Sequence, residues 1–282
     1  MSDLRLGLLG YPLIHTLSPS IHEKLFSLSG RRGQYTLFES EQATADGGWW
    51  FLDGFNVTIP HKQAVMPFLN RLDESALLYG AVNTVCCGTE RVGYNTDCLG
   101  LERALLTAGL NAKGHVLVCG CGGAGQMAAV WCLKAGCRVT VAVRPRGLEA
   151  AFLWAEALRG TDIAVLTYDE LKGPYDLLIN ATPAGMFPHT DAMPVSDGIL
   201  SRVGQVFDTV YNPADTLLLQ KARQLSLPAA GGLLMLVWQA AAAHRIWYGA
   251  EFSEEDIAAV AQAGRSALGA ARPADIAGGM RE

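Results

Sequence analysis

Three glycines near the middle of the chain have the spacing of a turn that binds a dinucleotide. They follow an apolar run, residues 115–119, and precede a stretch that favours a helix, residues 126–135. The first glycine allows the tight bend, the second lets the backbone approach a pyrophosphate, and the third lets the helix pack closely. Free N–H groups at the helix start then face the phosphates. The residues predicted to bind them are Gly120, Gly122, Gly123, Ala124 and Gly125.

The residues after the next predicted strand, 138–143, indicate which dinucleotide to expect. An NAD enzyme commonly places an acidic side chain there, on the ribose 2′-hydroxyl, whereas an NADP enzyme accommodates the 2′-phosphate with an arginine. This chain has Arg144 and Arg146, and no acidic residue before Glu149. Because guanidinium groups suit a dianionic phosphate, the pattern favours NADP and leaves NAD as the alternative. The other interpretation is that both arginines are solvated loop residues.

The composition excludes several classes of protein. Of 282 residues, 50% are hydrophobic and 17% are charged, against about 25% charged in an average globular protein. Disorder, a coiled coil and a charged tail are therefore excluded. The formal net charge of −5 provides no basic field for a phosphate backbone, so we expect no nucleic-acid partner.

Two uncharged stretches approach the length of a membrane span, which is about 20 residues. Residues 116–133 contain the glycine turn, and residues 224–243 contain Pro228 and a central Gln239, so we interpret both as buried segments. The first apolar run is too short for a secretory signal and soon reaches Pro12. We expect a soluble cytoplasmic protein with no membrane partner.

The seven cysteines do not have the spacing of a metal site. Their number is odd, and they lack the paired Cys-x-x-Cys and histidine spacing of tetrahedral zinc. We therefore expect no metal site and interpret the cysteines as buried free thiols in a reducing compartment. They are Cys86, Cys87, Cys98, Cys119, Cys121, Cys132 and Cys137.

Strands and helices alternate in the elements that must position these residues. In the first hundred residues, short apolar runs predict strands at 6–9, 34–38, 55–59, 81–86 and 91–94. Helices are predicted at 18–29 and 61–71. Ser18 is the expected N-cap of the first helix, with Pro19 at its first helical position. A helix over 99–108 is expected to link this unit to a second one.

The second unit has the pattern of a parallel sheet. Strands are predicted at 115–119, 138–143, 163–166, 177–181 and 206–208, and helices at 126–135 and 148–158. Such an alternation is typical of a doubly wound sheet with helices on both faces. Two further helices, over 233–247 and 254–271, are expected to complete the chain.

Seven short motifs, taken in order, make the chain similar to the shikimate dehydrogenase family, which includes quinate/shikimate dehydrogenases. The resemblance extends from Gly7 to about Gly249. The motifs are TLSP at 16–19, NVTIPHK at 56–62, GAVNT at 80–84, NTD at 95–97, NATPAGM at 180–186, DTVYNP at 208–213 and MLVWQA at 235–240.

The resemblance implies both a fold and a reaction. The implied fold is α/β, with a substrate domain over residues 1–98, a doubly wound parallel-sheet (Rossmann) dinucleotide-binding domain over 99–231, and C-terminal helices over 232–282 that return to the first domain. The implied reaction is reversible hydride exchange between NADPH and 3-dehydroshikimate, giving shikimate, in a cleft between the domains. The substrate is thus a small ring acid, and the expected assembly is a monomer or a homodimer.

By matching position, the resemblance implies that Lys62 and Asp97 are the catalytic pair. Oxidation of an alcohol releases a proton, so a neighbouring group must accept it and return it on reduction. A lysine beside a carboxylate also holds the substrate oxygen and stabilises its developing alkoxide charge. Taken alone, Lys62 is an exposed lysine at a helix start, and Asp97 an N-cap of the helix that follows it.

The other matching positions imply a site for a carboxylate and several hydroxyl groups, for which hydroxyl and amide side chains provide donors and acceptors. Gln239 carries an amide in the middle of an uncharged helix and so needs a polar partner. The implied ligands of the substrate carboxylate are Thr16, Ser18 and Tyr211, and those of the ring hydroxyls are Thr58, Asn83 and Gln239. Beyond the glycine turn and the arginines, the implied cofactor contacts are Thr182, Met186 and Gly232.

Three departures from the family pattern leave alternatives open. Thr16 replaces the usual serine, Cys98 stands where the family commonly has glycine, and only Arg144 remains of an Asn-Arg-Thr cofactor motif. The alternative enzyme is an NAD(P)-dependent paralogue that oxidises quinate, aminoshikimate or another cyclitol acid. A non-catalytic dinucleotide sensor is a third hypothesis, against which the presence of both Lys62 and Asp97 argues.

Overall fold

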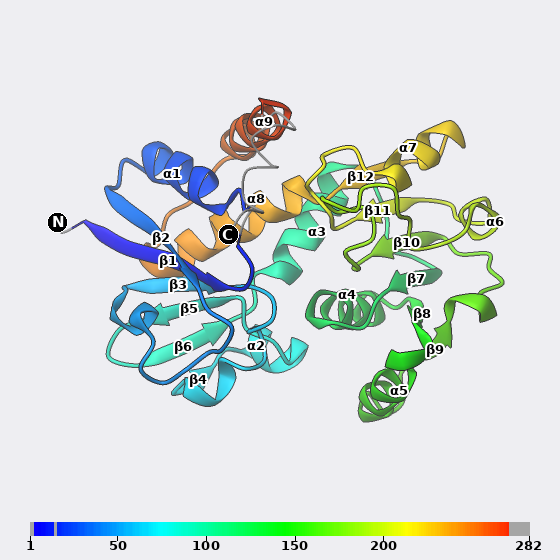
Figure 1. Cartoon of the computed structure of the whole chain (residues 1–282), viewed down its shortest axis with the longest axis horizontal. Coiled ribbons are helices and arrows are strands. Elements are labelled where there is room, and N and C mark those ends of the chain that lie inside the picture. Colours follow the sequence, from blue (N-terminus) through cyan, green and yellow to red (C-terminus); the bar gives the residue numbers. More distant parts are fainter. Residues whose placement is uncertain (1–2, 14–15, 271–282) are drawn as a thin grey trace, which may run out of the picture.

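Two sheets lie beside each other, with two long helices between them (Figure 1). The protein is seen here as a computed structural model, which describes residues 3–13 and 16–270. Within these residues each sheet has six strands, one sheet formed by the first hundred residues and the other by residues 115–231.

The first sheet is mixed, with strand order β2-β1-β3-β5-β6-β4. Its strands are β1 (Leu4–Gly10), β2 (Gly33–Glu39), β3 (Gly54–Val57), β4 (Arg71–Leu72), β5 (Thr84–Cys87) and β6 (Arg91–Tyr94). The strand β1 runs parallel to both neighbours, whereas β5 is antiparallel to β3 and β6. The last five residues of β1 are all buried, as expected for an apolar strand covered on both faces. The helix α1 (Ser18–Ser29) connects β1 to β2.

The second sheet is parallel throughout, with strand order β12-β11-β10-β7-β8-β9. Its strands are β7 (His115–Cys119), β8 (Arg138–Val143), β9 (Ile163–Thr167), β10 (Leu177–Asn180), β11 (Val206–Asp208) and β12 (Ala229–Gly231). Its helices are α4 (Gly123–Lys134), α5 (Leu148–Ala157), α6 (Asp197–Leu200) and α7 (Leu217–Gln224). The strand order reverses between β7 and β10, which is where such sheets bind ligands. The predicted doubly wound sheet is confirmed.

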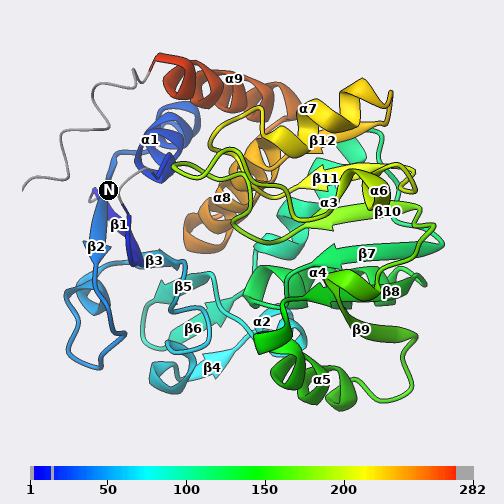
Figure 2. The same ribbon diagram turned by 45° about the vertical axis from the view of Figure 1, so that its right-hand side comes forward.

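The C-terminal helices return to the first unit, as the resemblance implies. The helix α8 (Leu233–Tyr248) packs against α3 (Asp97–Thr107), and α9 (Glu254–Ala270) lies over α1 and α8 (Figure 2). One apolar cluster joins Leu25 of α1, Val237 of α8 and Val260 of α9. The helices of this cluster thus come from both ends of the described chain.

Most predicted elements agree with the structure to within about three residues, but two local predictions are wrong. Leu17, not Ser18, is the N-cap of α1, because Ser18 is already the first helical residue, which makes Pro19 the second; the helix start has no side-chain cap. The helix expected over 61–71 is replaced by turns, a short 3-10 helix (Met66–Phe68) and β4. Pro67 has no N–H to donate to an earlier carbonyl, so a regular helix does not continue through it.

The sequence patterns do not predict several short elements. The last predicted helix lies only partly within the described residues. The helix α2 (Glu74–Tyr79), together with α6, α7 and β12, was not predicted. Three 3-10 helices, Gly48–Phe51, Pro145–Gly147 and Tyr168–Glu170, were also not predicted. Residue 271, the expected end of the last helix, lies outside the described residues.

All seven cysteines are free, but only three of them are buried. Cys119, Cys132 and Cys137 are buried, whereas the other four are half-buried. The interpretation as free thiols is therefore confirmed, whereas the expected burial holds for three of the seven. Among the described residues, no helix is long and apolar enough to span a membrane.

The contact between α3 and α8 yields a test of this packing. A Cβ atom on Gly100 would lie 2.7 Å from the backbone oxygen of Met235. Although alanine is the better helix former by up to about 1 kcal/mol, we expect Gly100→Ala to lower the free energy of unfolding by about 1–3 kcal/mol through overpacking. Urea unfolding measures the change.

Gly88→Ala is the matched control, because a Cβ atom there meets no heavy atom within 4 Å. It should leave the free energy of unfolding nearly unchanged. Equal stability of the two variants would contradict the close α3–α8 packing.

Candidate active site

The two residues implied to be catalytic form an ion pair. Lys62 lies in the turn after β3, and Asp97 is the first residue of α3. The Lys62 Nζ atom donates to Asp97 Oδ2 at 2.5 Å, and the side chains are 18% and 10% exposed. The pair is therefore largely desolvated yet open to solvent on the lysine side. Thr96, not Asp97, is the N-cap of α3, so the N-cap interpretation of Asp97 is wrong.

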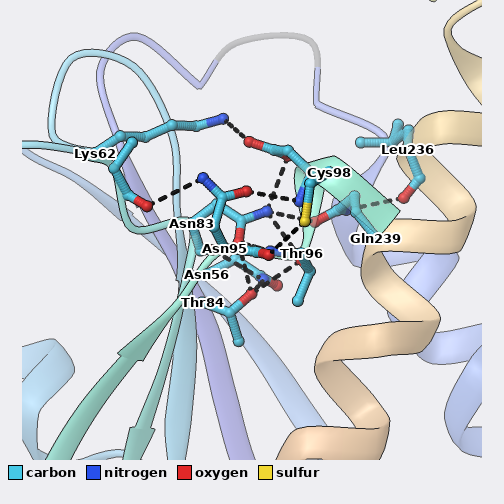
Figure 3. A network of polar contacts seen from close by, with 11 residues as sticks. Asn56, Lys62, Asn83, Thr84, Asn95, Thr96, Cys98, Leu236 and Gln239 are labelled. Carbon is cyan, nitrogen blue, oxygen red and sulfur yellow. Dashed lines mark hydrogen bonds and ion pairs between the residues drawn. The ribbon is translucent and has the colours of Figure 1, made fainter. Parts of the chain in front are cut away.

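A buried amide holds the second oxygen of Asp97. The Asn83 Nδ2 atom donates to Asp97 Oδ1 at 2.9 Å (Figure 3). Its Oδ1 atom accepts from the backbone N–H of Thr96 at 2.7 Å, and this obligate donor fixes which end of the amide faces Asp97. Both carboxylate oxygens of Asp97 thus face donors, which orients its side chain toward Lys62.

Gln239 reaches the same cluster from α8. Its Nε2 atom donates to the carbonyl of Leu236 at 2.8 Å, and its Oε1 atom accepts from Asn83 Nδ2 at 3.4 Å. Figure 3 shows Gln239 on the helix directly opposite Asn83. The buried amide therefore has the polar partner that its position in an uncharged helix requires.

Thr16, Ser18 and Tyr211 form a second polar group at the start of α1. The Thr16 hydroxyl donates to Ser18 Oγ at 3.0 Å, and the Tyr211 side chain packs against the apolar cluster that contains Leu17. Burial raises the pKa of Tyr211, so this hydroxyl stays protonated as a donor. The three residues implied to bind the carboxylate are brought together, although Tyr211 follows β11 of the other sheet.

Two residues that were not predicted as site residues join the Asn83 cluster. Tyr35 of β2 donates its hydroxyl to Asn56 Oδ1 at 2.7 Å. Asn56 of β3 donates to the carbonyl of Asn83 at 3.2 Å. Asn56 begins the NVTIPHK motif and is a polar side chain within an apolar strand, but the motif alone assigned it no role. Thr58 follows β3 and is half-buried, four residues before Lys62.

The glycine turn lies beside Lys62 and fits a pyrophosphate. Gly120 has φ +97°, and a Cβ atom on Gly125 would lie 2.2 Å from the Gly120 oxygen, so both positions require glycine. The helix α4 begins without a side-chain cap, and a Cβ atom on Gly122 would meet no heavy atom within 4 Å. The first N–H groups of α4 are thus available to phosphate oxygens. A Cβ atom on Gly123 would lie 3.7 Å from Lys62 Cδ.

The loop implied to face the nicotinamide is organised by Asn180. Its Oδ1 atom accepts from the N–H and hydroxyl of Thr182, and its Nδ2 atom donates to the Ala184 carbonyl at 3.2 Å. Met186 is 44% exposed at the end of this loop. Gly232 is the N-cap of α8, and a Cβ atom there would lie 2.1 Å from the Thr209 oxygen. Thr182 also borders the glycine turn, because a Cβ atom on Gly120 would lie 2.9 Å from its methyl carbon.

Asp208 holds Asn180 in place from the end of β11. This buried carboxylate accepts from Asn180 Nδ2 at 2.9 Å, from the Thr216 hydroxyl at 2.6 Å and from the N–H of Val210 at 3.0 Å. Burial raises the pKa of Asp208 to about 6, because the three donors only partly offset the lost hydration.

Arg144 and Arg146 lie at the carboxyl end of β8, and both are exposed. Arg144 is the N-cap of the short 3-10 helix Pro145–Gly147. In the described part of the chain, neither arginine forms an ion pair with a carboxylate. Their guanidinium groups are thus available to a phosphate, and Glu149 is exposed at the start of α5.

Known proteins show strong similarity to this chain. The shikimate dehydrogenase substrate binding domain, as a sequence family, matches residues 8–85. The shikimate dehydrogenase (NADP(+)) of Archaeoglobus fulgidus is 39% identical over 259 residues, covering 88% of this chain and 94% of the relative. That of Symbiobacterium thermophilum is 38% identical over 261 residues, covering 86% and 88%. The chain belongs to the shikimate dehydrogenase family.

Solved structures of this family share the fold. A chorismate mutase/shikimate 5-dehydrogenase fusion protein from Clostridium acetobutylicum has a TM-score of 0.85 at 31% identity, covering 96% of this chain and 100% of that one. The shikimate 5-dehydrogenase of Thermus thermophilus, solved in complex with NADP(H) and shikimate, has a TM-score of 0.83 at 31% identity, covering 93% and 99%. The two-sheet architecture is thus that of the family.

The raised pKa of Asp208 predicts a specific dependence of stability on pH. The ordinary aspartate value is 3.8, so between about pH 4 and pH 6 the native state holds a proton that the unfolded chain has released. The contribution of Asp208 to stability is present below this window and is lost as the pH rises through it. From about pH 4.5 to pH 7, we expect wild-type stability to fall by about 2 kcal/mol relative to Asp208→Asn.

Urea unfolding of both proteins at the two pH values measures this difference. Asp191→Asn, at an exposed loop position, is the matched control and should follow the wild type. A constant difference between wild type and Asp208→Asn across the window would show that Asp208 does not titrate there.

Proposed function

We propose that this chain is an NADP-dependent shikimate dehydrogenase, which interconverts shikimate and 3-dehydroshikimate. The observation that carries the proposal is the Lys62–Asp97 pair beside the glycine turn of the parallel sheet. A proton-accepting pair next to a dinucleotide turn is what the reversible oxidation of an alcohol requires. Relatives named shikimate dehydrogenase (NADP(+)) over most of the chain support the choice of substrate and cofactor.

Lys62 and Asp97 act on the reacting hydroxyl. Bound NADP would supply the acceptor for the hydride, the hydrogen and its two bonding electrons, that leaves the ring carbon. In the oxidation direction, the pair accepts the hydroxyl proton and passes it to solvent through the open lysine side, and in reduction it returns the proton. The Lys62 ammonium also stabilises negative charge that develops on the substrate oxygen. Asn83 keeps Asp97 aimed at the lysine throughout.

Two sets of polar side chains bind different parts of the ring acid. Thr16, Ser18 and Tyr211 present hydroxyl donors to the carboxylate. Thr58, Asn83 and Gln239 bind the ring hydroxyls, to which amides and hydroxyls offer both donors and acceptors.

The cofactor residues lie along the carboxyl edge of the parallel sheet. The turn formed by Gly120, Gly122, Gly123, Ala124 and Gly125 holds the pyrophosphate, and Arg144 and Arg146 hold the 2′-phosphate. Thr182, Met186 and Gly232 lie on the nicotinamide side.

The organisation of the chain follows from these sites. We propose a substrate domain over 1–98, a cofactor domain over 99–231 and C-terminal helices over 232–282. We further propose that the enzyme is cytoplasmic, because free thiols stay reduced in the cytoplasm. We also propose that it acts as a monomer or homodimer without nucleic-acid or membrane partners.

Initial rates with shikimate and quinate, each with NAD and NADP, test the proposed function. The combination of shikimate and NADP should give the highest kcat/KM. Faster oxidation of quinate would identify a paralogue, and absence of turnover with every combination would indicate a non-catalytic binding protein.

Removal of the lysine tests the catalytic pair. Lys62→Ala should fold normally and lose about 10²- to 10⁴-fold in kcat, the range for a positioned acid–base group. The KM for NADP should change little, because the glycine turn is built by the backbone of the other sheet. Lys134→Ala, at an exposed position, is the control. Lys62 has no catalytic role if its variant keeps more than half of the wild-type kcat.

Removal of Arg144 tests the preference for NADP. Charge-assisted hydrogen bonds to phosphate contribute about 1.5–3 kcal/mol, so Arg144→Ala should raise the KM for NADP roughly ten- to a hundredfold. The KM for NAD, which lacks the 2′-phosphate, should scarcely change. Arg159→Ala, exposed near the end of α5, is the matched control. An equal rise in the KM for NADP and for NAD would show that Arg144 does not bind the 2′-phosphate.

A further inference from the structure

A buried carboxylate lies at the carboxyl edge of the parallel sheet, where β10 and β11 end side by side (Figure 2). Asp208 is the last residue of β11 and pairs in register with Asn180, the last residue of β10. Both residues have an exposed fraction of 0%. Within residues 3–13 and 16–270, Asp208 forms no ion pair with a lysine or an arginine. Because an apolar residue could end this strand without a desolvation cost, the sheet alone does not account for the carboxylate.

The amide of Asn180 uses every hydrogen-bonding position that it has. Its Nδ2 atom donates to Asp208 Oδ1 at 2.9 Å and to the Ala184 carbonyl at 3.2 Å. Its Oδ1 atom accepts from the N–H of Thr182 at 3.0 Å and from the hydroxyl of the same residue at 2.7 Å. That hydroxyl in turn accepts from the N–H of Ala184 at 3.2 Å. One buried amide, held by Asp208, therefore fixes the loop over residues 182–186 near its start and at its middle.

Thr216 supports the same loop from a second direction. Its hydroxyl donates to Asp208 Oδ2 at 2.6 Å, and its exposed fraction is 0%. A Cβ atom on Gly185 would lie 3.5 Å from Thr216 Cβ, so this side chain also packs beside the loop. Gly185 has φ +86°, a conformation that favours glycine. The two oxygens of Asp208 thus bind two side chains that both contact the loop.

The supported loop has an accessible outer surface. Pro183 is exposed, and Met186 has an exposed fraction of 44%. The loop also borders the glycine turn, because a Cβ atom on Gly120 would lie 2.9 Å from the Thr182 methyl carbon. Buried polar groups that fix an accessible loop beside a ligand site lower the entropy lost on binding, since the loop is already ordered.

We propose that Asp208 and Asn180 are positioning residues, which hold the 182–186 loop in the form that receives the nicotinamide end of the cofactor. The inference rests on the proposed function, in which this loop lies on the nicotinamide side, and adds two buried residues outside the proposed contacts. It follows that Asp208 affects the affinity for the nicotinamide half of the cofactor. The adenosine half, which the glycine turn and Arg144 are proposed to hold, is independent of Asp208.

Two side chains of similar size at position 208 test this hold. Asparagine keeps an acceptor for Asn180 Nδ2, whereas leucine leaves that buried donor without its partner. The probes are NADPH and adenosine 2′,5′-bisphosphate, which has the 2′-phosphate but lacks the nicotinamide. We expect Asp208→Leu to raise the Kd for NADPH about tenfold and to leave the Kd for the bisphosphate nearly unchanged. Asp208→Asn is the matched control and should leave both constants nearly unchanged.

Titrations at about pH 8 keep the wild-type carboxylate ionised, because burial raises its pKa only to about 6. A general loss of structure would weaken both ligands together, whereas a displaced loop weakens NADPH alone. Equal Kd values for NADPH in the two folded variants, or an equal rise for both ligands in Asp208→Leu, would overturn the proposal.

Amide exchange in the unaltered protein provides an independent measurement, which decides the matter if Asp208→Leu fails to fold. The N–H groups of Thr182 and Ala184 donate to side-chain oxygens of the supported loop. In NMR spectra of the cofactor-free protein, both should exchange more slowly than in an unstructured chain of the same sequence. Exchange at the unstructured rate would overturn the proposal. If the wild type binds neither probe, the proposed function fails instead, while the two amides still show whether Asn180 holds the loop.

Discussion

The active site depends on the satisfaction of one buried amide, that of Asn83. Buried polar groups are costly unless they are hydrogen bonded, and the amide of Asn83 uses both of its ends. Its oxygen accepts from the Thr96 backbone, and its nitrogen donates to Asp97. Because the Thr96 N–H cannot accept, the amide has one orientation, and Asp97 is held where Lys62 reaches it. Asn56, Thr84 and Gln239 then surround this amide with further polar contacts.

The position of α3 brings this amide cluster to the cofactor sheet. Asp97 begins the helix, and Gly100 one turn later lies against the backbone of α8, which carries Gln239. The same helix leads directly into the parallel sheet through residues 108–114. Close helix packing at a glycine therefore sets the distance between Asp97 and Gln239, which come from two distant parts of the chain.

The sequence predicts local features better than long-range contacts. The glycine turn is predictable because a strand, three spaced glycines and a helix are adjacent in the chain, and the structure confirms its local shape. The prediction of a helix over 61–71 was wrong because it relied on the apolar spacing and gave too little weight to Pro67. The roles of Lys62 and Asp97 came only from family resemblance, since nothing local pairs residues that are 35 positions apart. The contact of His22 with His244 spans 222 positions and left no sequence signal beyond two histidines among apolar residues.

The closeness of Lys62 to Gly123 has a thermodynamic consequence. In the proposed function Lys62 holds the substrate oxygen, while its aliphatic carbons border the turn proposed for the phosphates. If a bound ligand on one side displaces this lysine and so alters the affinity for the other ligand, the two affinities change by the same factor. The Gln63–Gln126 hydrogen bond at 3.4 Å joins the adjacent residue to α4 and extends this shared boundary. The sites proposed for the cofactor and the ring acid thus share a boundary.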